Sequence, residues 1–200
     1  MARPIEFDIM TARESAMSLF WRNGYQASSL LDLLDEMKIG RGSFYAAFGD
    51  KRRLYLECLN LFAERTGAIV QKIRDKYPPM EAVRSFLQHS LNHTDESKAG
   101  LGCMAVNTVI ELAGIDDELA MVASAWLTKL QTLFEECLCE AGYSAARAAE
   151  YAAYLMLVNE GVRVASRRKL PRRQSLEAID TALRLLQTCL LYTSPSPRDS

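Results

Sequence analysis

Apolar residues recur three and four positions apart along most of this 200-residue chain, which is the spacing of amphipathic helices. A first helix is expected from about Glu6 to Asn23, where Gly24 ends it. Two short helices fit within residues 28–49, and a long helix fits from Asp50 to about Lys76. No segment shows the convincing alternation of a strand, so the pattern predicts an all-α protein.

Further helices are expected after the Pro78-Pro79 pair, which ends the long helix. They fall at about residues 80–93, 103–113, 117–141, 144–168 and 172–190, which makes about nine helices in all. We expect a three-helix domain over residues 1–49 and a larger helical domain over residues 50–190. The end of the chain, 191–200, contains YTSPSPRDS, which has two prolines and no apolar periodicity. This composition predicts a disordered tail, and its abrupt start suggests a non-native origin.

Residues 28–53 have the layout of a helix, a tight turn and a second helix. Ser28 or Ser29 can cap the first of these helices. Asp32 stands three residues after Ser29, as in a capping box. The segment therefore predicts a helix-turn-helix, a motif that lays its second helix in the major groove of DNA.

The second helix of this motif is expected to begin near Arg41, after Gly40. Phe44 and Phe48 are four residues apart, so they share the face that would anchor the helix to the core. The side chains left to face DNA are Arg41, Ser43, Tyr45 and Ala46. A basic triad opens the next helix, and there a bound phosphate is favoured over a merely solvated basic turn. The triad is Lys51, Arg52 and Arg53.

Two patterns of fixed spacing occur in the first quarter of the chain. They are Phe20-x-x-x-Gly24-Tyr25-x-x-Ser28-Ser29 and Ile39-x-Arg41-Gly42-Ser43-Phe44-Tyr45-x-x-Phe48-x-x-Lys51. Together they resemble the DNA-binding domain of the TetR/AcrR regulators. The rest of the chain is similar to that family only in its length and its all-helical layout.

The resemblance implies which residues contact double-stranded DNA. Tyr45 and Lys51 would meet phosphates, and Ser28 or Ser29 would touch the DNA backbone. The base edges would lie near the first turn of the second helix, that is, near Arg41, Gly42 and Ser43.

One departure from the family pattern lies in the turn. Lys38 stands where the family usually has Gly, and Gly40 stands where it usually has Ser or Thr. Since glycine adopts the left-handed conformation most easily, we expect the left-handed residue of this turn at Gly40.

The composition limits the location and the mode of binding. The net charge is −1, and residues 1–55 carry eight Lys or Arg against seven Asp or Glu, so DNA affinity must come from local clusters and from two copies acting together. Five cysteines without a CxxC pair do not suggest disulfides, which fits a reducing cytoplasm. Early charges argue against a signal peptide, and no apolar run approaches the length of a membrane span.

The last two expected helices carry features of an association surface. One has a leucine-rich seam with coiled-coil spacing, formed by Leu176, Ile179, Leu183, Leu186 and Leu190. The other has small residues that permit close packing, namely Ala145, Ala148, Ala149, Ala152 and Ala153. Either stripe can also be ordinary core. The resemblance implies a four-helix bundle across a two-fold axis, hence a homodimer on a near-palindromic operator.

A regulator of this kind needs no catalysis and no cofactor, but it needs a signal. We expect a small-molecule effector of unknown identity in a cavity of the larger domain. The candidate lining residues are Phe86, His89, Met104, Asn107, Trp126 and Met156.

Two alternatives concern how the signal arrives. Cys103 follows a glycine-containing loop at an expected helix N-terminus, a setting that can make a thiol reactive, although a small buried apolar residue is the commoner role. His89 and His93 have the i, i+4 spacing of a metal pair but lack a recognisable second pair of ligands. A thiol- or metal-responsive regulator therefore stays open, as does a Cys103-based redox protein.

Overall fold

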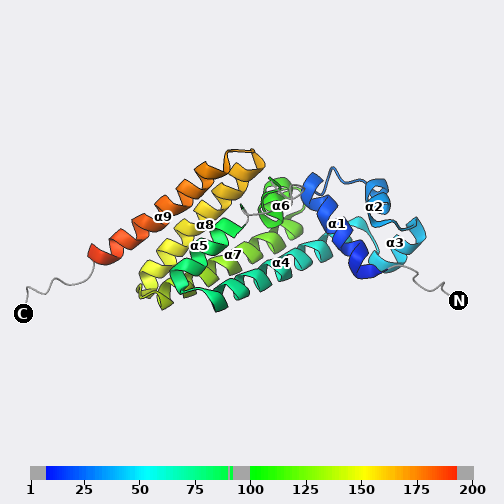
Figure 1. The fold of residues 1–200 in the computed structure, drawn as a ribbon. Helices are drawn as coiled ribbons and strands as arrows, with labels where there is room; N and C mark the ends of the chain where they lie inside the picture. The colour runs from blue at the N-terminus through cyan, green and yellow to red at the C-terminus, as the bar shows by residue number, and fades with distance from the viewer. Residues whose placement is uncertain (1–7, 90, 92–99, 193–200) are drawn as a thin grey trace, which may run out of the picture. The chain divides into compact units, whose positions relative to one another are not determined.

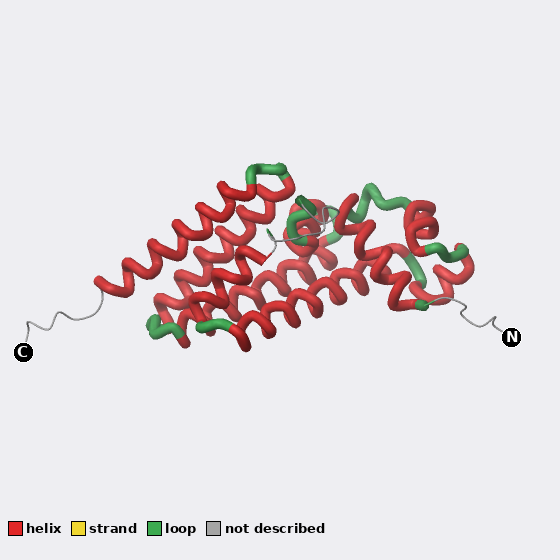
Figure 2. Tube along the Cα trace, viewed as in Figure 1, coloured by secondary structure: helices red, strands yellow, loops and turns green. Residues whose placement is uncertain are grey.

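The computed structural model describes residues 8–89, 91 and 100–192. Within these residues the chain forms nine helices and no strand, which confirms the all-α prediction (Figures 1 and 2). In chain order they are α1 (Ile9–Asn23), α2 (Leu30–Met37), α3 (Arg41–Phe48), α4 (Lys51–Lys76), α5 (Pro79–His89), α6 (Met104–Leu112), α7 (Asp117–Glu140), α8 (Ala145–Arg167) and α9 (Arg172–Tyr192). None of these helices is long and apolar enough to cross a membrane.

Side-chain caps set several helix starts. Asp8 accepts a hydrogen bond from the Met10 N–H at 3.0 Å, so α1 begins at Ile9, three residues later than expected. Ser29 and Asp32 form the predicted capping box, in which each side chain bonds the backbone N–H of the other. Ser144 caps α8 in the same way, by accepting from the N–H three residues later.

The described chain divides into two compact units. The first combines the residues up to Ala68 with Cys103–Trp126, and the second combines Ile69–Gly102 with the residues from Leu127 onward. This division does not coincide with the expected boundary after residue 49, because α6 and the first part of α7 pack with α1 to α4. The expected tail, 191–200, lies almost entirely outside the described residues, apart from the end of α9.

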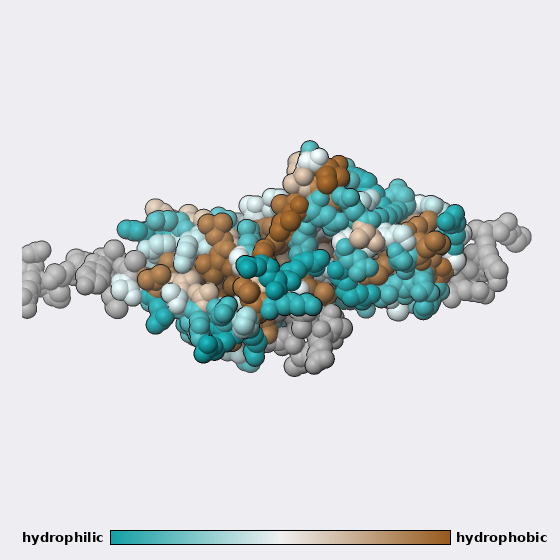
Figure 3. All heavy atoms as spheres, turned by 90° about the horizontal axis from the view of Figure 1, so that it is seen from above, coloured by the Kyte–Doolittle hydropathy of each residue, from teal (hydrophilic) through white to brown (hydrophobic). Residues whose placement is uncertain are grey.

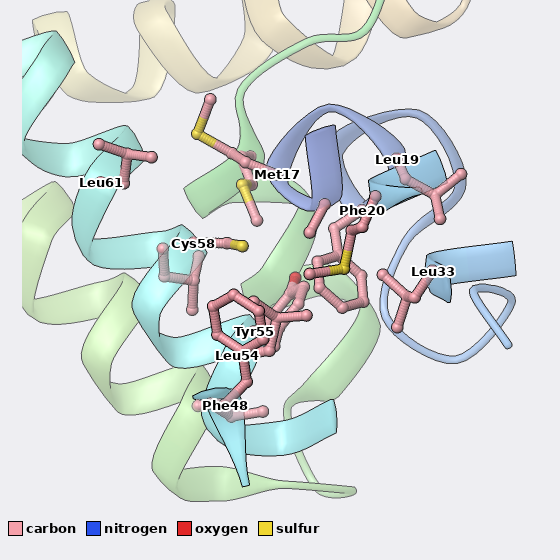
Figure 4. Packing of buried hydrophobic residues seen from close by; sticks show 14 of the residues in the cluster. Met17, Leu19, Phe20, Leu33, Phe48, Leu54, Tyr55, Cys58 and Leu61 are labelled. Atoms are coloured by element: carbon pink, nitrogen blue, oxygen red, sulfur yellow. The ribbon is translucent and has the colours of Figure 1, made fainter. Parts of the chain in front are cut away.

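An aromatic cluster forms the centre of the first unit. Phe20, Phe44, Phe48 and Tyr55 are at most 1% exposed. Figure 4 shows Phe20, Phe48 and Tyr55 among aliphatic side chains of the same cluster. The rings of Phe44 and Phe48 lie 5.9 Å apart, which confirms that both residues anchor α3 to the core. Burial of a side chain of this size stabilises the fold by about 1.5–3 kcal/mol.

The leucine-rich seam of α9 lies inside the second unit. Ile179, Leu183 and Leu186 are at most 4% exposed, and α9 packs against α5 and α8 (Figure 1). An ion pair between Arg84 and Asp180 joins α5 to α9. For these three residues the prediction of an association surface is therefore wrong, because the chain buries their side chains itself, whereas Leu176 is half-buried.

A different face of α8 and α9 reaches the surface. Leu157 is 69% exposed and Leu185 is 57% exposed. A groove of about 560 Å³ is open beside Tyr154 and Gly161, between the two helices. Figure 3 shows apolar side chains among polar ones where α8 and α9 form the surface. The alanines of α8 divide in the same manner: Ala148 and Ala152 are buried, whereas Ala145, Ala149 and Ala153 are exposed.

Candidate nucleic-acid interface

The turn before α3 is a Schellman-type end of α2. The Lys38 N–H bonds the Asp35 carbonyl and the Ile39 N–H bonds the Leu34 carbonyl, each at 3.2 Å. This pattern requires a left-handed residue at Lys38, which has φ 54° and ψ 40°. Gly40 is extended, with φ −77° and ψ 156°. The prediction of a left-handed Gly40 is therefore wrong, because α2 ends at Met37 and this end fixes the position of the left-handed residue.

Helix α3 presents the predicted DNA-contacting residues on one exposed surface. It begins at Arg41, as expected, and Gly40 offers no side-chain cap to its first N–H groups. Tyr45 is 49% exposed, and its ring packs edge to face on Phe44 at 5.4 Å. The remaining exposed residues of this surface are Arg41, Gly42, Ser43 and Ala46.

The structure separates the two serines that were candidates for the DNA backbone. Ser28 is fully buried, and its hydroxyl donates to the Gly24 carbonyl at 2.7 Å. Its side chain therefore has no access to DNA, so the predicted side-chain contact from Ser28 is withdrawn. Ser29 is exposed, and its hydroxyl donates to Asp32 at 2.6 Å. A contact between Ser29 and the DNA backbone stays a prediction.

The basic triad at the start of α4 has three different environments. Lys51 places its Nζ 4.4 Å from the centroid of the Tyr25 ring. Arg52 donates to Asp116 at 2.7 and 3.0 Å and to Glu118 at 2.6 Å. Arg53 lies 3.6 Å from Glu57, a long ion pair, and is exposed. The structure therefore does not direct all three cations at one phosphate, because Arg52 is paired with Asp116 and Glu118 of its own unit.

The surroundings of the basic triad shift the pKa of Lys51 and the pKa of Asp116. Partial burial lowers the pKa of Lys51, and the charge of Glu111 acts against that shift. Hydrogen bonds from Arg52 lower the pKa of Asp116. The charges of Lys51 and Asp116 therefore depend on their neighbours at the start of α4.

The turn between α1 and α2 receives a carboxylate from α6. Glu111 accepts hydrogen bonds from the Tyr25 N–H at 3.0 Å and from the Gln26 N–H at 2.8 Å. Gly24 precedes this pair with φ 87°, and a Cβ there would lie 2.6 Å from the Glu111 carboxylate. Sequence reasoning missed Glu111, because its partners are 85 and 86 residues away and no local pattern marks it.

A buried hydroxyl pair also joins α4 to α6. The Tyr55 and Thr108 hydroxyl oxygens lie 2.7 Å apart, and Thr108 donates to the Met104 carbonyl at 2.8 Å. The Tyr55 hydroxyl is consequently the donor to Thr108. Burial raises the pKa of Tyr55, so it stays a neutral donor.

The six candidate effector-binding residues are distributed over both units. Met104, Asn107 and Trp126 belong to the first, and Phe86, His89 and Met156 belong to the second. Phe86 borders a cavity of about 10 Å³, which is room for about one water molecule. An effector site lined by these six residues stays a prediction.

The thiol and metal alternatives also remain predictions. Cys103 is the N-cap of α6, as its sequence context indicated, and it is 8% exposed. His93 lies outside the described residues, so the histidine pair has no described geometry. Burial lowers the pKa of His89, and Arg163 lowers it further. Among the described residues no three His, Cys, Asp or Glu side chains are grouped to hold a metal ion.

Two family models match the chain. One, described as bacterial regulatory proteins of the tetR family, matches residues 13–58. The other, described as the C-terminal domain of LmrA/YxaF-like transcriptional regulators, matches residues 79–182. The two matches cover the helix-turn-helix and most of the remaining helices.

Individual relatives agree with these matches. The chain is 30% identical over 135 residues to the HTH-type transcriptional regulator YezE of Bacillus subtilis, which covers 67% of this chain and 70% of the relative. It is 25% identical over 140 residues to the HTH-type transcriptional repressor ComR of Escherichia coli, with 69% and 67% covered. A solved structure of the TetR-family regulator CifR, a cysteine mutant in complex with a 26-bp double-strand operator DNA, aligns with a TM-score of 0.82 and 28% identity, and covers 91% of this chain and 98% of CifR.

A pair of substitutions tests the geometry of the turn. We expect Lys38→Gly to raise the free energy of unfolding by up to about 1 kcal/mol, because glycine removes the Cβ that strains a left-handed residue. Chemical denaturation at one fixed protein concentration measures the change.

Gly40→Ala is the matched control, since Gly40 is extended and no atom lies within 4 Å of an added Cβ. We expect its free energy of unfolding to differ from the wild type by no more than about 1 kcal/mol, because the lower entropy of the unfolded chain offsets the weaker preference for alanine at the N-cap of α3. A larger destabilisation by Gly40→Ala together with no gain from Lys38→Gly would contradict the assignment.

Proposed function

Because this chain belongs to the TetR family of transcriptional regulators, and so is a DNA-binding regulator and not an enzyme, we propose that it is a ligand-responsive repressor. In this proposal a homodimer binds a near-palindromic operator, and a small-molecule effector releases it. The observation that carries the proposal is α3, whose core-facing phenylalanines are buried while the candidate DNA-contacting residues are exposed.

The proposed DNA contacts divide into base and phosphate contacts. Arg41 makes no ion pair within the described residues, and an arginine can donate two hydrogen bonds to the O6 and N7 atoms of guanine. Gly42 and Ser43 are small, so the helix can approach the base edges there. The Tyr45 hydroxyl, the Lys51 ammonium and Ser29 would meet phosphates, which fix the register of the protein on DNA.

The proposed dimer uses the outer face of α8 and α9. This face combines exposed apolar side chains such as Leu157 and Leu185 with small residues that admit a second copy closely. In the dimer two α3 helices would reach successive major grooves, roughly 34–36 Å apart. The two-fold symmetry of the protein would match the near-palindrome of the operator.

The last part of the proposal is that the protein represses transcription from the operator and that an effector releases it from the DNA. ComR is a repressor by its name, and the CifR structure holds operator DNA. An effector bound in the larger helical part of the chain would favour a dimer whose α3 helices no longer match successive grooves. A coupling of about 1–3 kcal/mol would change operator affinity by roughly 5–150-fold.

A thiol-responsive regulator is the second candidate, favoured by one observation. Cys103 occupies the N-cap position of α6, the helix whose Glu111 binds the α1–α2 turn, so a change at Cys103 would occur at the start of that helix. Its low exposure works against reactivity.

Selection of bound duplexes from a random DNA pool tests the DNA contacts. We expect the wild type to enrich a near-palindrome. Lys51→Ala should weaken binding to every sequence and reduce the slope of log affinity against log salt by about one for each lost contact. Arg41→Ala should instead relax the preference at one base position per half-site, at a cost of about 1–3 kcal/mol.

Arg168→Ala is the control, since Arg168 is an exposed cation that follows α8 and is not among the proposed DNA contacts. It should leave the selected sequence and its affinity unchanged. If the wild type enriches no sequence, the proposed function is wrong.

A charge placed within the proposed dimer surface tests it. We expect Leu157→Glu to weaken dimerisation by more than tenfold, because an unpaired carboxylate would become buried in the interface. Light scattering during gel filtration measures the mass over a range of concentrations. Met121→Glu is the control, because Met121 is also 69% exposed but lies on α7. A dimer that persists in Leu157→Glu would place the interface elsewhere.

The thiol alternative is tested by titration and DNA binding together. We expect the exposed Cys139 to react with a thiol reagent before Cys103, and Cys103→Ser to keep the operator affinity of the wild type. An electrophile that releases DNA from the wild type but not from Cys103→Ser would instead favour the thiol-responsive regulator.

A further inference from the structure

We propose that Glu111 is a positioning residue of the DNA interface: its carboxylate fixes the α1–α2 turn, and the Tyr25 ring in that turn fixes the Lys51 ammonium. The inference rests on the proposed function, because it presupposes that Lys51 meets operator phosphate. It assigns part of the DNA-binding geometry to α6, a helix outside the helix-turn-helix motif.

The first step is the pair of hydrogen bonds by which Glu111 fixes the α1–α2 turn. The carboxylate oxygens accept from two successive backbone N–H groups, those of Tyr25 and Gln26, at 3.0 and 2.8 Å. Hydrogen bonds to an ionised acceptor are roughly twice as strong as those between neutral groups. Two adjacent bonds from one carboxylate also fix the orientation of the turn, which a single bond would leave free to rotate.

The turn is built to admit this carboxylate. Gly24 adopts φ 87°, and a Cβ at this position would lie 2.6 Å from Glu111 Oε2, well inside van der Waals contact. Position 24 therefore favours glycine for two reasons: the backbone φ is positive, and a side chain would collide with Glu111. The oxygen that this Cβ would meet is the one that accepts from the Tyr25 N–H, so Gly24 leaves room for that hydrogen bond.

The second step runs from the turn to α4. The Tyr25 ring lies under the Lys51 ammonium at 4.4 Å, within the range of a cation–π contact. The same ring packs against Tyr55 at 4.9 Å between centroids and against Phe20 at 6.3 Å. Because the ring is held on these sides, its position limits where the ammonium of Lys51 can lie. The charge of Glu111 also raises the pKa of Lys51 against the effect of burial.

Other contacts keep α6 and α7 in place when Glu111 is changed. Thr108 bonds Tyr55, and Asp116 and Glu118 bond Arg52. Removal of the Glu111 carboxylate therefore frees the α1–α2 turn without detaching α6 from α4. The effect on DNA binding can then be measured in a folded protein.

The experiment is a double-mutant cycle between Glu111 and Lys51 in the full-length protein. Fluorescence anisotropy measures the affinity for a duplex selected by the wild type, at several salt concentrations. We expect Glu111→Ala to weaken binding on the order of tenfold and to lower the salt slope as Lys51→Ala does. In the Lys51→Ala background, Glu111→Ala should add less than about twofold, because the group it positions is already gone.

Glu118→Gln is the matched control. It removes a carboxylate from the same segment, but Arg52 keeps Asp116, so operator affinity should stay that of the wild type. Two results would overturn the inference: wild-type affinity in Glu111→Ala, or a full tenfold loss repeated in the Lys51→Ala background.

Two further measurements keep the outcomes distinct. If Glu111→Ala does not fold, as judged by circular dichroism, Tyr25→Leu replaces it, because that variant keeps the backbone N–H groups on Glu111 and removes only the ring. Tyr25→Leu should then share the nonadditive loss with Lys51→Ala, and additive losses would overturn the inference. If the wild type selects no DNA, the proposed function fails instead.

Discussion

Helix α3 has eight residues, too few to be stable as an isolated helix, so its position depends on the burial of Phe44 and Phe48. Both side chains are fully inaccessible to solvent. Because they are four residues apart, they occupy one face of the helix and turn Arg41 and Tyr45 to the other side. The exposed surface of α3 is therefore a consequence of how the helix is held, and a change in the core beneath it changes the direction of every candidate DNA contact.

That core is not completed by the first four helices alone. Met104 and Leu112 of α6 and Leu119 of α7 belong to the same hydrophobic cluster as Phe44 and Phe48. Carboxylates of this segment also accept hydrogen bonds from the α1–α2 turn and from the start of α4. A helix far along the chain thus supplies both apolar and polar support to the helix-turn-helix. An event that moves α6 would act inside the unit that carries α3, without a long path of intervening contacts.

Local interactions could be predicted from the sequence, and distant ones could not. The Ser29 cap, the Phe44–Phe48 pair and the end of α1 at Gly24 depend on residues within one or two helical turns. Glu111 accepts hydrogen bonds from a turn 85 residues away, and a single glutamate in a helical pattern gives no sign of such a partner. The leucine-rich seam of α9 shows the same limit from another side: its spacing predicts an apolar face, but not whether the face is covered by the same chain or by a second copy. The prediction of a left-handed Gly40 is wrong for a different reason: glycine intrinsically favours that conformation, whereas the end of α2 places it at Lys38.

Charge pairing within the first unit bears on why two copies would be needed. Arg13 pairs with Glu57, Arg22 with Glu36 and Arg52 with Asp116, so these cations are already matched by carboxylates of the same unit. Arg41, Lys51 and the exposed Arg53, whose ion pair is long, are then the principal cations that one copy can direct to DNA at the proposed interface. Phosphate contacts supply much of the affinity for DNA, and each neutralised phosphate adds to the salt dependence. A near-neutral chain with few such contacts gains specific affinity most directly by repeating them through two-fold symmetry, which makes dimerisation a thermodynamic requirement of the proposed function and not an addition to it.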